Sequence, residues 1–245
     1  MKKFKLIALA TLLVSAMSGY SADNLDLWGT SVSPYVRKVV NTMEYKKLKY
    51  TQHEILPQSL LEATNQEIPV TFKKASPLGK IPALTTSKGS ISDSAVIVAY
   101  LEKKYPGNQI YPSNNQDYAD ALWLEKYADT VLSEVIHKIF IERVVVPLVL
   151  NQNTNNEIVA NLEMNELPKI FSYLNNWIKE KNTPYLTGKS ISIADFAVAN
   201  HLVSLEPAQI NWQTGEYPYL EQYYKTMMNN KIFNKSIPDI LKTKK

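Results

Sequence analysis

The sequence predicts an α/β domain followed by an all-helical domain. In residues 25–105, apolar runs of strand length alternate with two helical patterns, whereas beyond residue 117 every apolar pattern repeats at helical spacing. A polar, turn-rich stretch at residues 106–116 separates the two parts and is expected to be a linker. The predicted domains therefore cover residues 25–105 and 117–240.

Composition limits the classes of function. The 245 residues are 45% hydrophobic and 20% charged, which is typical of a globular protein with a buried core. The formal net charge is +4, but Lys2, Lys3 and Lys5 lie in a segment that we expect to be removed, and about +1 remains without them. That charge does not indicate nucleic-acid binding. The sequence has no cysteine, which excludes disulfides, thiolate metal ligands and a cysteine nucleophile.

Residues 1–22 have the pattern of a cleaved secretory signal peptide. A basic start precedes an apolar run from Leu6 to Val14, which is far shorter than the roughly 20 residues needed to span a bilayer. Small residues between Ser15 and Ala22 allow several cleavage points, so the cut site stays open. We expect a periplasmic or secreted mature chain that is not in the membrane. The alternative is that the segment remains as an anchor.

The first domain begins with a predicted strand, helix and strand. Residues 25–28 are apolar and short, and Ser33-Pro34 predicts a helix start, because serine is favoured as an N-cap and proline at the first helical position. Residues 50–56 alternate as a second strand, which predicts a parallel pair. The apolar side of the helix runs from Val36 to Met43, and four charged residues are expected in solvent: Arg37, Lys38, Lys46 and Lys47.

A loop with irregular helical turns is expected at residues 57–74, before a hairpin. Ala83–Thr85 and Ser90–Ser92 flank the turn residues around Gly89. A helix over residues 94–105 follows and ends at Pro106. This order of strands and helices is that of thioredoxin-like folds.

The second domain is predicted to hold four helices, at residues 118–146, 156–181, 192–205 and 217–228, with a kink at Pro168. Ser192 and Asp195 have the spacing of a capping box, which explains Asp195 without a functional role. The three histidines do not have the spacing of metal ligands, so no metal site is expected.

Two motifs in the first domain predict a peptide-sized binding edge. In SPLGKIPAL, which starts at Ser76, a cis bond between Ile81 and Pro82 would turn the Ile81 backbone N–H and C=O outward, where an extended peptide could pair with them. Eleven residues after Pro82, Asp93-Ser94 opens a helix, and helix N-termini bind anions.

These motifs resemble the glutathione S-transferase family. PLGKIPAL, the Asp-Ser step before YLEKKYP, and SPYVRKV carry the resemblance, which runs from about Leu25 to about Phe233 and is similar to serine-type, bacterial-like members. It implies a thioredoxin-like domain that binds glutathione, an all-helical second domain and a homodimer. The implied activity is conjugation of the glutathione thiolate, as co-substrate, to a small hydrophobic electrophile.

The resemblance also assigns residues. Ser33 would stabilise the thiolate, with Ser31 and Tyr35 as the reserve candidates. Lowering a thiol pKa from about 8.5 by two units needs about 2.7 kcal/mol. A hydroxyl donor to an anion contributes roughly 1.5 to 3 kcal/mol and a helix N-terminus roughly 0.3 to 1. The two effects together are sufficient, and Ser33 at a helix start can supply both.

The remaining groups of glutathione each have an implied partner. Asp93 would bind the ammonium, although many members have glutamate at this position. Ser94 would bind the γ-glutamyl carboxylate, Lys80 the glycyl carboxylate, and the Ile81 backbone before Pro82 the cysteinyl unit. The acceptor pocket is expected between the domains, lined by Thr30, Val32, Tyr35, Tyr127 and Val131.

Two other functions stay open. One is a glutathione-dependent peroxidase or lyase, in which glutathione itself would turn over because the protein has no cysteine. The other is a non-catalytic binding or interaction protein of the periplasm that keeps the family's fold.

Overall fold

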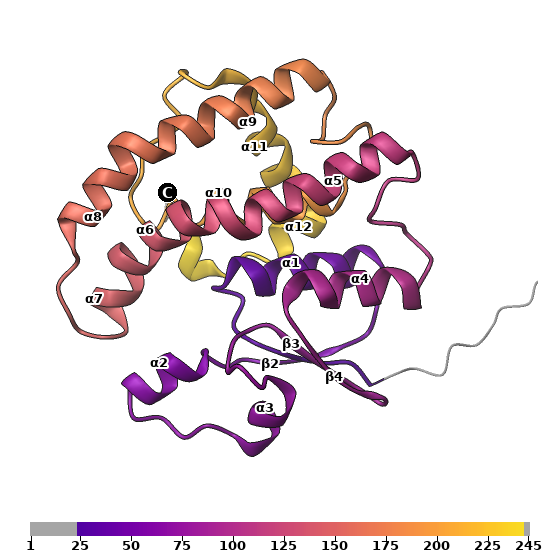
Figure 1. Cartoon of the computed structure of the whole chain (residues 1–245), viewed down its shortest axis with the longest axis vertical. Helices are drawn as coiled ribbons and strands as arrows, with labels where there is room; N and C mark the ends of the chain where they lie inside the picture. The colour runs from indigo at the N-terminus through magenta and orange to yellow at the C-terminus, as the bar shows by residue number, and fades with distance from the viewer. Residues whose placement is uncertain (1–23, 243–245) are drawn as a thin grey trace, which may run out of the picture.

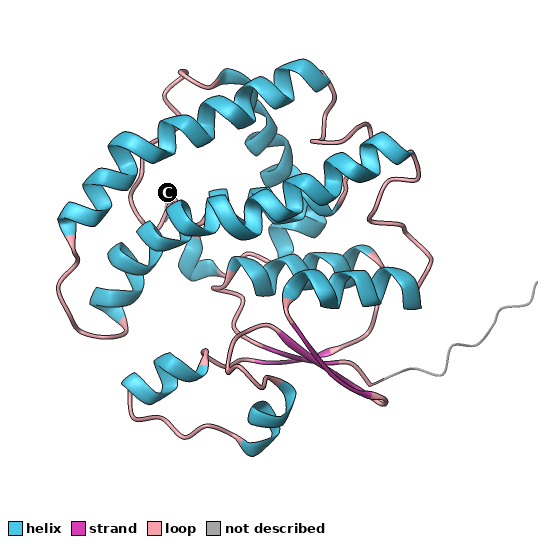
Figure 2. Cartoon of the chain, viewed as in Figure 1, coloured by secondary structure: helices cyan, strands magenta, loops and turns pink. Residues whose placement is uncertain are grey.

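The computed structural model describes residues 24–242, which form a mixed sheet with helices followed by a helical domain (Figures 1 and 2). The predicted signal peptide at residues 1–22 lies outside the described residues. Within the described range, no helix combines the length and apolar character that crossing a membrane requires.

The sheet has four strands: β1 (Asp26–Trp28), β2 (Thr51–His53), β3 (Ala83–Thr86) and β4 (Gly89–Ser92). Their order is β2-β1-β3-β4, with β1 parallel to β2 and the other pairs antiparallel. Leu27 pairs with Leu84 at the centre, and both are fully buried. The predicted thioredoxin-like fold is therefore confirmed.

Four helices belong to the first domain. Figure 1 shows α1 (Pro34–Tyr45) and α4 (Ser94–Lys104) between the sheet and the helical domain. The predicted loop between β2 and β3 contains two short helices on the far side of the sheet, α2 (Gln58–Ala63) and α3 (Val70–Ala75).

Helix α1 is buried on both faces, which corrects one expectation from the sequence. The apolar residues pack as predicted, but Arg37, Lys38 and Lys46 are also buried, and only Lys47 of the four charged residues is exposed. The reason is that α1 packs between the sheet and α10 (Ile193–Val203) of the second domain. Its charged side chains therefore need partners inside the protein.

The first helical stretch of the second domain alternates between α and π winding. It comprises α5 (Asn115–Tyr127), η1 (Ala128–His137), α6 (Lys138–Phe140), η2 (Ile141–Val145) and α7 (Val146–Leu148). Each π segment adds a residue per turn and so rotates the side chains that follow it. This rotation decides which side chains face the first domain.

The rest of the second domain is helical as well. Its elements are α8 (Asn156–Asn161), η3 (Leu162–Glu166), α9 (Leu167–Lys181), α10, α11 (Pro218–Asn229), α12 (Lys231–Lys235) and the 3-10 turn η4 (Asp239–Leu241). The last two were not predicted. The capping box is present, and Asp195 accepts from the Ser192 N–H at 2.7 Å and the Leu186 N–H at 2.9 Å.

Candidate active site

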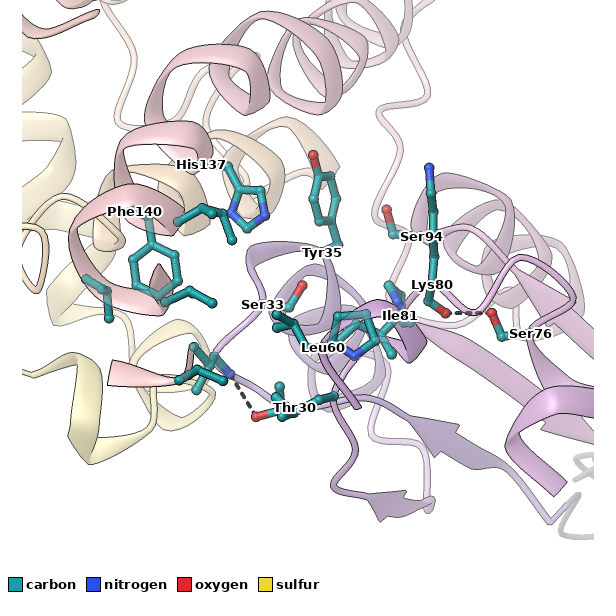
Figure 3. Close-up of a pocket in the computed structure, with 18 of the residues that line it drawn as sticks. Thr30, Ser33, Tyr35, Leu60, Ser76, Lys80, Ile81, Ser94, His137 and Phe140 are labelled. Atoms are coloured by element: carbon teal, nitrogen blue, oxygen red, sulfur yellow. Dashed lines mark hydrogen bonds between the residues drawn. The ribbon is translucent and has the colours of Figure 1, made fainter. Parts of the chain in front are cut away.

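A cavity of about 610 Å³ lies between the two domains. The first domain contributes the loop after β1, the loop before β3 and the start of α4, and the second domain contributes one side of η1, α6 and η2 (Figure 3). Nine of the twelve residues that the sequence singled out line it: Thr30, Val32, Ser33, Tyr35, Lys80, Ile81, Pro82, Asp93 and Ser94.

The loop that carries Ser33 is held from both sides. The Gly29 N–H donates to the His53 carbonyl at 3.0 Å, which ties the loop to the end of β2. The buried Arg37 guanidinium donates from Nη1 to the Ser31 carbonyl at 3.0 Å and the Val32 carbonyl at 2.8 Å. These bonds fix the backbone immediately before Ser33.

Gly29 lets this loop approach its neighbours closely. Its φ is +141°, a conformation that L side chains rarely adopt, and a Cβ there would lie 2.6 Å from Val36 Cγ2 and 3.1 Å from Ile81 Cβ. The absence of a side chain at Gly29 therefore brings the start of α1 against the Ile81 loop.

Ser33 is the N-cap of α1. Its Oγ accepts from the Val36 N–H at 3.5 Å, which is the outer limit for a hydrogen bond. The cap uses a lone pair of the hydroxyl, and no described residue accepts its hydrogen. Ser33 can thus donate to an anion at the tip of the helix.

The two reserve hydroxyls are arranged differently. Ser31 accepts from Gln52 Nε2 at 2.9 Å and is not among the residues that line the cavity. Tyr35 lines it, but its hydroxyl donates to Ser133 and points away from Ser33 (Figure 3). Burial raises the pKa of Tyr35.

The segment before β3 presents an open backbone edge. The Ile81-Pro82 peptide bond is cis. Ser76 donates to the Lys80 carbonyl at 2.6 Å, and the Gln58 N–H donates to the Gly79 carbonyl at 2.8 Å. Neither the N–H nor the carbonyl of Ile81 has a hydrogen-bond partner within residues 24–242.

The start of α4 offers donors and a carboxylate. Asp93 Oδ1 accepts from the Ala95 N–H at 2.9 Å and the Val96 N–H at 3.2 Å, and Asp93 has φ 80°. The hydroxyl and N–H of Ser94 have no partner in the described part of the chain, and Lys80 likewise forms no ion pair there. The cavity thus combines free donors and a cation with one carboxylate oxygen not used in capping.

The second-domain wall differs from the one expected. Tyr127 and Val131 do not line this cavity: Tyr127 packs at a tilt in a ring cluster, its centroid 4.8 Å from that of Tyr173, and Val131 packs against the core. A neighbouring stripe at helical spacing faces the cavity instead: Asp129, His137, Phe140, Ile141 and Val144. This spacing was the one signal in the sequence that could have found them, and the π segments decide which stripe points inward.

Two side chains of this wall are titratable. Asp129 accepts from the buried Lys38 at 2.6 Å. Burial raises the pKa of Asp129, with a contribution from Asp93, although the charge of Lys38 opposes this change. Burial, and next the charge of Arg37, lowers the pKa of His137 to about 4. Among the described side chains, no group of three or more ligands is placed to hold a metal ion.

The site is therefore half polar and half apolar. Its polar half has donors for anions, a carboxylate for a cation, a free backbone pair and a hydroxyl at a helix tip. Its apolar half combines side chains of the second domain with Leu60 and Leu78 of the first. A zwitterionic peptide in extended form fits the first half and an apolar molecule fits the second.

Comparison with known protein families identifies the same two domains in the sequence. The N-terminal domain of the glutathione S-transferase family matches residues 27–109, and its C-terminal domain matches residues 140–235. Together the two matches cover most of the chain. The first corresponds to the sheet domain and the second lies within the helical domain.

Individual relatives agree. The chain is 25% identical over 222 residues to glutathione S-transferase omega-1 of Sus scrofa, covering 87% of each protein. It is 28% identical over 170 residues to elongation factor 1-gamma 2 of Oryza sativa subsp. japonica, covering 69% of this chain and 39% of that protein. It therefore spans about two fifths of the length of that relative.

A solved structure shows the same fold. The apo form of human glutathione S-transferase T1-1 superimposes with a TM-score of 0.76 at 21% identity, over 89% of this chain and 90% of the other. With both domains of the family matched in order, and with the fold they specify observed, the chain belongs to the glutathione S-transferase family.

Proposed function

We propose that the protein is a glutathione transferase that conjugates the glutathione thiolate to a small hydrophobic electrophile. The observation that carries the proposal is the Ser33 hydroxyl. No residue between 24 and 242 accepts its hydrogen. Ser33 is the N-cap of α1 and lines a cavity that also has an open backbone edge and an apolar wall. The similarity to omega-1 supports the same activity.

Glutathione has two carboxylates, one ammonium and a central peptide unit. Lys80 faces the glycyl carboxylate as a point charge, and Ser94 receives the γ-glutamyl carboxylate with its N–H and hydroxyl. Asp93 binds the ammonium with the carboxylate oxygen that does not cap α4. The Ile81 N–H and carbonyl pair with the cysteinyl unit as an added strand.

In this pose the sulfur lies at the tip of α1. The Ser33 hydroxyl donates to it, and the helix N-terminus contributes a further favourable field. The thiolate then attacks an electrophile held against Phe140 and Val144 of the apolar wall.

The first experiment measures retention on immobilised glutathione together with conjugation of chlorodinitrobenzene. Retention with turnover supports the proposal, and Ser33→Ala should abolish most turnover while the variant stays bound to the column. Full turnover by Ser33→Ala would refute the role of Ser33.

A non-catalytic binding role is the second candidate. It is favoured by the similarity to an elongation factor over both domains. Retention without turnover of any electrophile, combined with no peroxidase or lyase activity towards glutathione adducts, would establish it. Turnover of a hydroperoxide with oxidation of glutathione would instead indicate a peroxidase.

We also propose export and dimerisation. The basic and apolar start of the chain supports a cleaved signal and a periplasmic or secreted location. N-terminal sequencing of the protein recovered from cell fractions tests it, and a mature chain that still begins at Met1 in the cytoplasm would refute it. Light scattering tests the expected homodimer.

A further inference from the structure

Arg37 carries a buried positive charge that has no carboxylate partner. Its side chain is fully buried, and all five N–H groups of the guanidinium are used. Nε donates to Asn200 Oδ1 at 2.9 Å, Nη1 to the carbonyls of Ser31 and Val32, and Nη2 to the Asn200 carbonyl and Ser204 Oγ. Each of these acceptors is uncharged, and no carboxylate within residues 24–242 forms an ion pair with Arg37.

The two other buried cations of this helix have acidic partners. Lys38 pairs with Glu125 and Asp129, and Lys46, at the end of α1, pairs with Glu102. Arg37 nevertheless stays protonated near pH 7, because burial lowers its pKa only to about 9. Burying a charge is costly, and a neutral donor could also satisfy the same carbonyl groups. Hydrogen bonding alone therefore does not account for a charge at this position.

The guanidinium lies beside the loop that leads to Ser33. Nη1 bonds to the Ser31 and Val32 carbonyls at 3.0 and 2.8 Å, immediately before that residue. The field of the charge also reaches the cavity, because Arg37 contributes, after burial, to the lowered pKa of His137, which lines it. An anion bound at the tip of α1 would therefore be stabilised by a charge that no carboxylate of the described chain neutralises directly.

We propose that the buried charge of Arg37 stabilises the bound glutathione thiolate through space, in addition to the hydrogen bond from Ser33. The inference rests on the proposed transferase function and adds a residue to it. Arg37 is not among the residues that line the cavity, so it acts through its field and not by contact. Two unit charges roughly 10 Å apart, at an effective dielectric constant of about 20, change a pKa by about 1 unit. We expect a contribution of this size.

The sharpest test leaves Arg37 in place and gives it a carboxylate partner. Asn200→Asp keeps an acceptor for Nε and keeps the bonds of Nη1 to the loop, but it balances the charge. We expect the thiol pKa of bound glutathione, measured from the ultraviolet absorbance of the thiolate, to rise by about 1 unit. Conjugation at pH 6.5 should then fall about 10-fold and recover at high pH. Arg37→Gln should have the same effect, because it removes the charge.

Asn175→Asp is the matched control for the added negative charge. Asn175 does not line the cavity, and its Oδ1 accepts from the Tyr219 and Leu220 N–H groups, which a carboxylate can also do. The thiol pKa should stay unchanged in this variant. Urea unfolding and glutathione affinity report whether each variant is folded. If Asn200→Asp does not fold, Arg37→Lys is compared with Arg37→Gln, because only lysine keeps the charge.

The outcomes separate the charge of Arg37 from its hold on the loop. An increase in Arg37→Gln without one in Asn200→Asp, or equal increases in Arg37→Lys and Arg37→Gln, would mean that Arg37 only holds the loop, and would overturn the inference. An equal increase in Asn175→Asp would overturn it as well. A lowered wild-type thiol pKa that no variant changes contradicts this inference alone. A wild type whose bound glutathione keeps the ordinary thiol pKa of about 8.5 also contradicts the proposed function.

Discussion

Replacing Ser33 with alanine separates the role of its hydroxyl in the reaction from its role in capping. A hydroxyl donor to an anion contributes about 1.5 to 3 kcal/mol, and one pKa unit corresponds to about 1.4 kcal/mol, so the pKa of the bound thiol should rise by about 1 to 2 units. The conjugation rate near pH 6.5 should therefore fall roughly 10- to 100-fold and approach the wild-type rate at high pH.

Stability should change much less. The Val36 N–H to Ser33 Oγ bond is 3.5 Å long, so its loss should cost less than the about 1 kcal/mol typical of an N-cap. The assay is a pH titration of the ultraviolet absorbance of the bound thiolate, beside urea unfolding. Ser31→Ala is the matched control, because Ser31 does not line the cavity and should leave the thiol pKa unchanged. An unchanged pKa in Ser33→Ala, or the same increase in Ser31→Ala, would refute the reasoning.

Three further predictions concern stability and are read from urea unfolding. Gly29→Ala should lower the free energy of unfolding by about 2 to 4 kcal/mol, because its Cβ would meet Val36 Cγ2 at 2.6 Å and its φ is +141°. Gly107→Ala is its control, since nothing lies within 4 Å of the added Cβ, and similar losses in both would contradict the steric argument. Asp195→Ala should lower the free energy of unfolding by about 3 kcal/mol, because it leaves the buried Ser192 and Leu186 N–H groups unpaired. Its control is Asp239→Ala, which should lower this free energy by under about 0.5 kcal/mol because the Asp239 side chain is exposed. Finally, His137 has a pKa of about 4 in the folded protein, below the unfolded value of about 6.5. Its contribution to the free energy of unfolding is therefore complete above pH 6.5 and is lost as the pH falls towards 4. Between pH 6.5 and pH 4, His137→Phe should therefore lose about 3 kcal/mol less of its free energy of unfolding than the wild type does. The ring contacts Tyr35 and Phe140, and the charge of Arg37 acts on it. The control His201→Phe reports the other buried histidine, whose pKa is also lowered, by burial and next by His137. An acid profile that His137→Phe leaves unchanged would contradict the prediction.

Much of the fold followed from local patterns in the sequence. The hairpin around Gly89, the helix start at Ser33-Pro34 and the Ser192 capping box each depend on a few adjacent residues, so their sequence signals are strong. The short helices α12 and η4 were missed because a single turn has no measurable periodicity.

The first-domain half of the cavity could also be found from sequence, because it is built from contiguous motifs. Ser33 and Ser94 stand at the start of a helix and Ile81 stands just before a strand, and such ends are marked by proline, serine and aspartate. Their positions along one cavity match this expectation, and their roles in binding glutathione stay predictions.

The tertiary structure alone decided which faces of the helices are buried. Arg37 and Lys38 are residue types typical of a solvent-exposed helix face, yet both are buried because α10 covers the second side of α1. The periodicity of a helix sequence does not show how many other elements the helix packs against. Likewise, His137 and Val131 both lie on η1, and only the packing of η1 against its neighbours makes His137 rather than Val131 line the cavity. The sequence by itself thus determined the order of the elements and the motifs at their ends, whereas the rotation and contacts of long helices depend on packing between residues far apart in the chain.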